Sequence, residues 1–384
     1  MFRLEKRLLS IMDKYLPILV ACVFAVLGVS MRRALMDFVS ADSRFFLLPW
    51  YDQIKTHGLH QPVGNYNFLY QLLIFGMTKL STEPLHAYKL LSAFFDYAMA
   101  IGVALLVFHA SNDLWKSVVA FGAVILSPIV ALNSSAWAQC DAIFSCFGVF
   151  ALLALAKERY WLAMVLLGIS FSFKLQAVFL PPFFLFYYYK ERRFSLLMFV
   201  LIPMTMIATG LPAILFGRSP MDVFTVYKEQ TQTYESMSMN YPSLWALLTQ
   251  PDSTEQYALL KQFAMVLTVG ILAILMIQWL QKKVCVSSVN VLIVAFLLTY
   301  TCVLFLPAMH ERYGYLYEIL AIAVAVLLPK TIPLCAALVG ISLCTYGSYL
   351  FKADTLSMVT LTVVNLLVYG GYVWYLQRQI QSEK

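Results

Sequence analysis

The sequence predicts an all-α polytopic membrane protein. Apolar residues make up 61% of the 384 residues and charged residues only 12%, whereas a soluble domain carries about 25% charged residues. The mean hydropathy is +0.76, and the apolar residues gather in long runs. Each helix that crosses the bilayer needs about 20 consecutive apolar residues. These runs leave no room for a sizeable soluble domain, so residues 1–384 are expected to form one integral membrane domain.

Twelve apolar runs are predicted to span the membrane. The first follows a basic N-terminal segment without a small-residue cleavage site, so it is expected to remain as an uncleaved helix. The runs at 160–173 and 175–189 are short. The expected spans are 16–33, 85–109, 117–133, 140–156, 160–173, 175–189, 194–216, 259–281, 288–306, 314–329, 331–350 and 355–377.

Basic residues predict the orientation. With both termini in the cytoplasm, Lys and Arg outnumber Asp and Glu in the inner loops, and the basic clusters at 190–193 and 282–283 lie inside, as the positive-inside rule requires. The net charge of +7 is spread over short loops, which fits a cell membrane with an anionic inner leaflet and does not indicate a nucleic-acid partner.

The outer face is expected to carry two long connections, 34–84 and 217–258. Within the first, the segments at about 43–57 and 66–80 are predicted to be interfacial helices. Counting 66–80 as a span would invert every later loop. Polar chemistry concentrated on one face favours an enzyme that acts there.

A carboxylate early in the first outer connection is the first candidate catalytic residue. Asp42 follows the first span and begins an aromatic, amphipathic segment that includes Arg44. A carboxylate held at the membrane interface can take a proton from an acceptor hydroxyl, and the neighbouring residues suit a lipid-borne substrate. Alternatively, Asp42 caps a helix at 43–57, since Asp is a favoured N-cap. Asp37 and Asp52 are rival bases.

Candidate phosphate-binding residues follow two later apolar runs. His310, Glu311 and Arg312 stand together at an expected outer interface. Arg offers a planar fork that matches phosphate oxygens, His can donate a second bond, and Glu311 would orient one of them. Lys174 lies between two apolar runs and would add a second cation. The alternatives are an interfacial anchor for the cluster and a snorkelling side chain for Lys174.

Four further polar residues are candidate sugar ligands. Gln139 and Asp141 stand at the outer start of a span and could hold sugar hydroxyls, although an acidic residue in a first helical turn also favours the helix dipole. Asn65 and Asn67 flank Tyr66 before the second interfacial helix. Their amides and the tyrosine suit sugar recognition, and the segment equally suits a turn.

The remaining polar residues indicate structure more than chemistry. Lys89 and Asp96 lie seven residues apart in one span and are expected to form a structural pair. Tyr234, Tyr241 and Trp245 in the second outer connection would cover the site or face lipid. No Cys or His spacing is typical of a metal site, so neither a metal nor a cofactor is predicted.

Together these motifs resemble the GT-C superfamily of polyprenyl-phosphate-sugar-dependent glycosyltransferases, which includes bacterial surface-glycan transferases and dolichyl-phosphate-glucose glucosyltransferases. Asp42 and the aromatic residues after it are similar to that superfamily's early carboxylate and aromatic helix. Residues 137–144 are similar to its Gln-x-Asp segment and 173–176 to its Phe-Lys-Gln turn. Residues 310–312 are similar to its His-Glu-Lys motif, with Arg in place of Lys, whereas 66–68 departs from its Tyr-Pro-Pro entry.

The resemblance covers roughly residues 10–320. It implies a hexosyltransferase in which Asp42 is the base, and Lys174, His310 and Arg312 bind the donor phosphate. It further implies inversion at the anomeric carbon without an essential metal. The donor would be a polyprenyl-phosphate sugar, undecaprenyl-linked in a bacterium, and the acceptor a surface glycan, glycolipid or protein. The enzyme that makes the donor is a possible partner. The expected substrate-binding residues are Arg44, Asn65, Asn67, Gln139, Asp141 and Glu311.

Two other classes remain open. A glycan ligase or polymerase of the O-antigen type also has about twelve spans, but its cations would be expected in the large late loop. Here residues 217–258 contain only Arg218 and Lys228 as basic residues. A lipid or sugar transporter would show related halves and charged residues at mid-membrane, of which Lys89, Asp96 and Glu318 are the main examples.

Overall fold

The computed structural model describes residues 3–231, 235–248 and 250–380, so Tyr234 lies outside the described residues. The fold is all-α, as predicted. The first half contains α1 (Arg3–Arg33), η1 (Ser43–Leu47), α2 (Leu48–His57), α3 (Phe68–Met77), α4 (Pro84–Ser111), α5 (Leu114–Ile125), α6 (Pro128–Ala131), η2 (Leu132–Ala136), α7 (Asp141–Ala156), α8 (Tyr160–Phe173), η3 (Leu175–Phe179) and α9 (Pro181–Glu191).

The second half adds more helices and two very short strands. They are η4 (Leu196–Val200), α10 (Leu201–Leu215), α11 (Asp222–Gln230), β1 (Ser238–Met239), η5 (Leu244–Leu247), α12 (Thr254–Gln281), α13 (Ser288–Phe305), β2 (Met309–His310), α14 (Tyr315–Leu327), η6 (Pro329–Thr331), α15 (Ile332–Phe351) and α16 (Met358–Gln379).

Seven helices in the described part are long and apolar enough to cross a membrane, or eight if α5 and the bent segment after it form one span. The expected count of twelve is therefore not confirmed. Helices α7, α8 and α14 have 16, 14 and 13 residues, and a rise of about 1.5 Å per residue leaves them short of a hydrocarbon core of about 30 Å. Hydropathy alone cannot separate such short buried helices from full spans.

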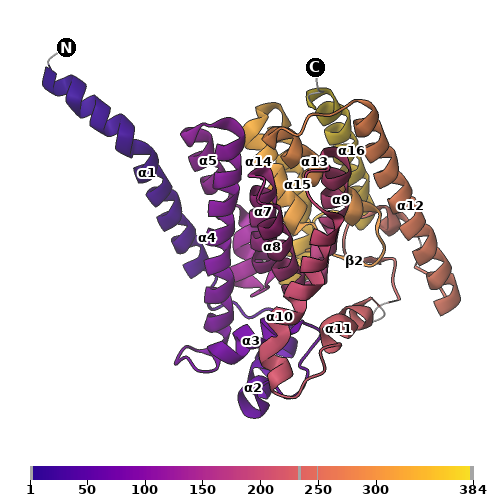
Figure 1. Cartoon of the computed structure of the whole chain (residues 1–384). Coiled ribbons are helices and arrows are strands. Elements are labelled where there is room, and N and C mark those ends of the chain that lie inside the picture. The colour runs from indigo at the N-terminus through magenta and orange to yellow at the C-terminus, as the bar shows by residue number, and fades with distance from the viewer. Residues whose placement is uncertain (1–2, 232–234, 249, 381–384) are drawn as a thin grey trace.

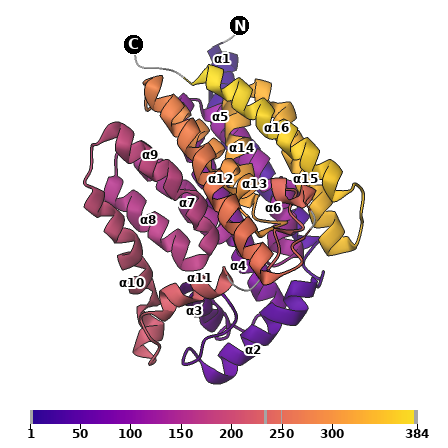
Figure 2. The ribbon, with the colours of Figure 1, turned by 90° about the vertical axis from the view of Figure 1, so that its right-hand side faces the viewer.

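The helices surround a central α13. Of its most apolar 18-residue window, 83% is buried, against 11% for α1, which leans away from the bundle at its N-terminal end (Figure 1). Both termini lie at one end of the bundle, while α2, α3 and α11 gather at the other end in both views (Figures 1 and 2). The two helices expected in the 34–84 connection are therefore present, and they lie at the end opposite the termini.

Two buried charges of α4, Lys89 and Asp96, do not pair with each other as expected. Nζ of Lys89 donates to three backbone carbonyls within residues 35–38, at 2.9, 2.7 and 2.6 Å. Asp96 instead accepts from Nε of Arg32 at 2.8 Å. A separation of seven residues places two side chains near one helix face but does not exclude partners from other segments. The observed partners hold the turn that leads to Asp42.

Candidate active site

The carboxylate of Asp42 is surrounded by donors from three segments. Its Oδ2 accepts hydrogen bonds from Nε1 of Trp137 at 2.9 Å and Nε2 of Gln139 at 2.7 Å. Its Oδ1 accepts from the hydroxyl of Tyr349, and Nη1 of Arg312 lies 3.6 Å from Oδ2. The side chain makes no capping bond to η1. The helix-cap alternative is therefore wrong, and Asp42 faces the interior of the bundle.

The backbone around Asp42 is tied to the segment that supplies its donors. The hydroxyls of Ser40 and Ser43 both donate to the carbonyl oxygen of Trp137, at 3.1 and 3.4 Å. Between Trp137 and Gln139, Ala138 has φ +63°, a left-handed conformation that non-glycine residues seldom adopt. The resulting turn directs the side chains on both sides of Ala138 toward one carboxylate oxygen. Strain of this kind concentrates at functional sites.

A second carboxylate pairs with the expected lysine. Asp141 begins α7, and Lys174 lies in an extended link between α8 and η3. Nζ of Lys174 donates to Oδ1 of Asp141, while Nδ2 of Asn133 donates to Oδ2 at 3.0 Å. Both Lys174 and Asp141 are buried. Lys174 therefore does not snorkel, and the two residues expected to bind different parts of the substrate form one buried ion pair.

Arg312 stands between three carboxylates. Its guanidinium nitrogens lie 3.6 Å from Asp42, 3.5 Å from Asp141 and 3.6 Å from Glu311, and the group sits 5.3 Å from the ring of Trp137. These separations are longer than hydrogen bonds. The Nε of Arg312 is buried and has no hydrogen-bond partner among the described residues. A buried charged donor left in this state can take up an anion at little cost.

The 217–258 connection holds the His310 loop in place. β1 pairs in parallel with β2, with Met239 opposite His310. The N–H of Ala308, which has φ +58°, donates to the carbonyl of Met237 at 2.9 Å. Nearby, Tyr241 and Trp245 are both buried, and neither faces lipid. The Nε1 of Trp245 donates to a backbone carbonyl at the end of α13 at 2.6 Å.

Burial sets the charges of the His310 loop. Burial, together with the charges of Arg312 and Lys174, lowers the pKa of His310 to about 3. The ring is therefore neutral at pH 7 and can donate through one nitrogen only. Burial also raises the pKa of Glu311 above its ordinary value, since a low dielectric disfavours the charged form. Lys174 and Arg312, the two cations of the site, thus lie beside three carboxyl groups. Of these, Glu311 is protonated more easily than an exposed glutamate.

Three expected ligands lie away from this charged cluster. Arg44 and Asn65 are exposed. Asn67 caps α3 through its side-chain oxygen, and its Nδ2 donates to the carbonyl of Val223 at 3.0 Å. Its side chain therefore has a structural role, as the turn-former alternative proposed, and the structure gathers Gln139, Asp141 and Glu311 but not these three residues around Arg312.

Sequence reasoning missed several residues of the site. Nδ2 of Asn133 donates to Asp141 at 3.0 Å, and no motif marked this residue. Trp137 stood inside a recognised motif without a role, and its position beside Gln139 was the available signal. Tyr349 lies in an apolar helix with no local feature to mark it. Its contact with Asp42 spans 307 residues, so it is visible only in the fold.

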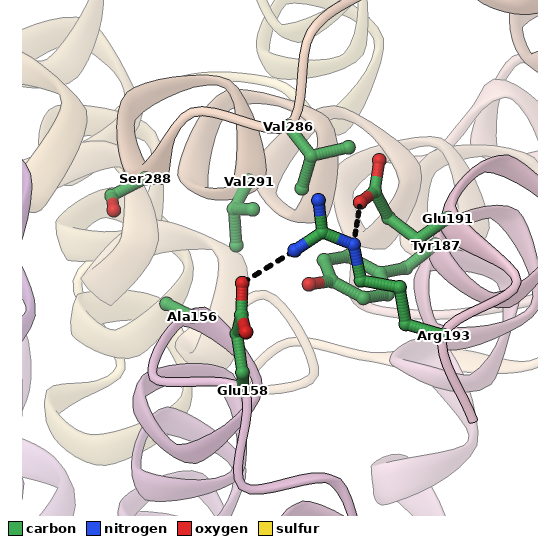
Figure 3. Close-up of a pocket in the computed structure, with 8 residues that line it drawn as sticks. All are labelled: Ala156, Glu158, Tyr187, Glu191, Arg193, Val286, Ser288 and Val291. Carbon is green, nitrogen blue, oxygen red and sulfur yellow. Dashed lines mark hydrogen bonds and ion pairs between the residues drawn. The ribbon is translucent and has the colours of Figure 1, made fainter.

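A cavity of about 170 Å³ lies at the other end of the bundle, near the C-terminal ends of α7 and α9. Figure 3 shows Arg193 between two carboxylates there. Its Nη1 lies 2.5 Å from Glu158, and its Nε lies 3.0 Å from Glu191. The arginine is thus already paired, and α7 separates this cavity from Asp141 by its full length.

A family model for glycosyltransferase family 87 matches residues 68–307 of the chain. The chain belongs to this family. The family is of the GT-C type, which confirms the resemblance drawn from the motifs, and the protein is a glycosyltransferase. The matched region of the transferase contains Gln139, Asp141 and Lys174, whereas Asp42 and Arg312 lie outside it. A search for similar proteins of known function found no match.

Proposed function

We propose that this glycosyltransferase transfers a hexose, with inversion, from a polyprenyl-phosphate donor to a glycan, glycolipid or protein acceptor. Its active site is the cluster around Arg312, on the outer face of the cell membrane, with both termini cytoplasmic. The observation that carries the proposal is the 3.6 Å separation between Arg312 and Asp42. A candidate base and a candidate phosphate-binding cation share one buried site.

In the proposed reaction, Asp42 accepts the proton of an acceptor hydroxyl. The oxygen attacks the anomeric carbon from the face opposite the phosphate and forms the new glycosidic bond. The bond between that carbon and the phosphate oxygen breaks, and the lipid phosphate leaves with the electron pair. Attack from the opposite face inverts the anomeric configuration.

Three residues stabilise the leaving phosphate in this proposal. Arg312 offers a buried Nε without a hydrogen-bond partner in the described part of the chain, and Lys174 provides a second positive charge. His310, neutral at pH 7, provides one N–H donor. Preorganised donors of this kind stabilise charge as it develops on the leaving group. Burial raises the pKa of Glu311, so protonation of this carboxyl, which would reduce repulsion of the incoming phosphate, costs less than for an exposed carboxyl.

The membrane explains the choice of donor class. Asp42 directly precedes η1 and α2, and α2 and α3 lie at the end of the bundle opposite the termini (Figure 1). A donor with a polyprenyl tail stays in the bilayer and presents its phosphate at this level. In a bacterium the donor would carry undecaprenyl phosphate, and the enzyme that makes it is a candidate partner.

The test is transfer of radiolabelled sugar from a panel of undecaprenyl-phosphate hexoses to endogenous membrane glycan. We expect transfer by the wild-type protein and a loss of at least about 100-fold in Asp42→Asn, since general-base catalysis contributes about 10²–10⁴-fold. Arg312→Leu should lose activity as well, with a weaker affinity for the donor. Asp252→Asn, in an exposed loop before α12, is the matched control and should remain active.

Two results would count against the proposal. Transfer by Asp42→Asn at the wild-type rate would remove Asp42 as the base. Transfer from a sugar nucleotide in place of every lipid-linked donor would overturn the donor class. Thermal stability of each purified variant in detergent separates lost chemistry from lost folding.

A further inference from the structure

Helix α15 lies outside the region matched by the family model. One of its side chains forms a hydrogen bond with the candidate base, Asp42. Tyr349 lies near the C-terminal end of α15 and donates its hydroxyl hydrogen bond to Oδ1 of Asp42. Its ring stacks on Trp137 with a centroid separation of 4.6 Å and an interplanar angle of 20°. Trp137 itself donates to the other oxygen of the same carboxylate. Base, tryptophan and tyrosine therefore form one closed arrangement.

The two oxygens of Asp42 are occupied unequally. Oδ2 accepts hydrogen bonds from Trp137 and Gln139, and Nη1 of Arg312 lies 3.6 Å from the same oxygen. A carboxylate oxygen offers about two lone-pair sites, so Oδ2 is filled. Oδ1 accepts one hydrogen bond, that of Tyr349, from the described side chains. A lone pair on Oδ1 remains for a proton from outside.

We propose that Tyr349 is the positioning residue of the base, and that its hydroxyl holds the Asp42 carboxylate with Oδ1 as the atom that receives the acceptor's proton. The inference rests on the proposed function of Asp42. In the step, the acceptor O–H bond breaks and its proton bonds to Oδ1, while the acceptor oxygen forms the bond to the anomeric carbon. Tyr349 keeps its own proton throughout and remains a donor to Oδ1.

The position of Tyr349 also indicates the side from which the acceptor arrives. Oδ2 faces Arg312 and the buried cation side, where the donor phosphate would bind. Tyr349 and Leu350 are half-buried, and Phe351 and Lys352 after them are exposed. The acceptor therefore reaches Oδ1 over the C-terminal end of α15, opposite the donor. In-line displacement requires this arrangement, because the nucleophile and the leaving group lie on opposite faces of the anomeric carbon.

Other titratable groups near Asp42 bear on any pH measurement. They come from the loop between α13 and α14, from the segment before α3 and from α15. These groups are Arg312, Glu311, Tyr66 and Tyr349. Of these, Tyr349 alone bonds Oδ1, so removal of its hydroxyl changes the base without removing a charge.

The experiment compares pH–rate profiles of the full-length wild-type protein and Tyr349→Phe in detergent or nanodiscs, with separate titrations of donor and acceptor. Phe keeps the ring on Trp137 and removes only the hydroxyl. The carboxylate loses a bond that favours its charged form, so the acid limb of kcat should move up by about one pH unit. We expect kcat to fall about tenfold and the donor KM to stay unchanged. Tyr369→Phe is the control, because Tyr369 is also half-buried but bonds Thr301, at 2.8 Å.

A second variant keeps the inference testable if Tyr349→Phe fails to fold. Difluorotyrosine at position 349 preserves the shape and strengthens the donor, so the acid limb should move to lower pH. An acid limb that is unmoved in both variants, while Asp42→Asn is inactive, would overturn the role of Tyr349 and leave the proposed function standing. An active Asp42→Asn would instead overturn the base on which this inference rests.

Discussion

The side-chain amide of Gln139 donates to Oδ2 of Asp42 at 2.7 Å and accepts from the hydroxyl of Tyr66 at 3.2 Å. The amide orientation is fixed by these two partners, since its nitrogen must face the carboxylate and its oxygen the phenol. Gln139 thereby links the 34–84 connection to the segment before α7. The bond to Asp42 is charge-assisted, a class that is shorter and stronger than neutral hydrogen bonds.

Gln139→Leu should therefore slow sugar transfer without unfolding the protein. A hydrogen bond to a charged group is worth about 1.5–3 kcal/mol, which corresponds to a rate loss of about 10- to 100-fold if the full amount is lost in the transition state. The measurement is kcat for transfer from the lipid-linked donor. Gln377→Leu makes the same change near the far end of α16, where Gln377 bonds Gln278. Equal rates for both variants would contradict the role of Gln139.

Lys89→Met should destabilise the protein and also reduce activity. The lysine is fully buried and donates to three carbonyls in the turn that precedes Asp42. Methionine fills similar volume but leaves those carbonyls unpaired, and each buried unsatisfied group costs about 1–3 kcal/mol. We expect a loss of about 3 kcal/mol or more, measured by thermal unfolding in detergent.

The control for this prediction is Lys79→Met, at an exposed position after α3. Its melting temperature should equal that of the wild type. A Lys89→Met protein as stable as the wild type would show that water replaces the ammonium group in this turn. If Lys89→Met is as stable as the wild type but less active, the role of Lys89 is to position the segment that carries Asp42 and not to stabilise the fold.

Much of the fold could be predicted from sequence because apolar runs determine which segments can enter a membrane. The helices after Asp42 and before Lys89 were also expected and are present as α2 and α3. The twelve spans were not confirmed, since short helices such as α14 are as apolar as true spans and differ only in length. Pairing failed for Lys89 and Asp96 because their partners lie in other segments.

The candidate site was predictable where residues share a short motif and unpredictable where they meet across the chain. Gln139 and Asp141 stand two residues apart, and the motif drew attention to both. Their separate partners, Asp42 and Lys174, could be named as candidates, but the ion pair between Asp141 and Lys174 could not be foreseen. Tyr349 meets Asp42 only because α15 packs close to the segment before α7, a relationship that hydropathy does not encode.

The His310 ring should make stability depend on pH. Its pKa is about 3 in the folded protein and about 6.5 when unfolded, so the unfolded state binds more protons between these values. The contribution of the neutral His310 ring to the free energy of unfolding is therefore fully present above pH 6.5 and is lost as pH decreases toward 3. At pH 5 the loss is about 2 kcal/mol. The measurement is the unfolding midpoint at pH 7.5 and pH 5.

His310→Gln isolates this effect, because Gln keeps an N–H donor and does not titrate. Its stability should fall less between pH 7.5 and pH 5 than that of the wild type. Glu311 titrates in the opposite sense, since its raised pKa makes the folded state the tighter proton binder. Comparison of the two proteins cancels this contribution. Identical pH dependence in both would exclude a buried neutral His310.

The backbone at Ala138 supplies the last prediction. Its φ of +63° is open to glycine without strain, costs alanine about 1 kcal/mol and is an outlier for β-branched residues. Ala138→Gly should therefore be as active and at least as stable as the wild type. Ala138→Val should force the turn toward an extended conformation, which separates Trp137 from Gln139 and removes donors from Asp42.

We expect Ala138→Val to lose about tenfold or more in transfer rate, in line with the cost of misplacing a catalytic group. Ala142→Gly, in the first turn of α7, provides the comparison, since a helical site should be destabilised by glycine by about 1 kcal/mol. Opposite responses of positions 138 and 142 to glycine would identify the left-handed turn as the reason. An active Ala138→Val would mean that the donors of Asp42 tolerate a different turn, and that Gln139 is held by Tyr66 and Asp42 rather than by its backbone.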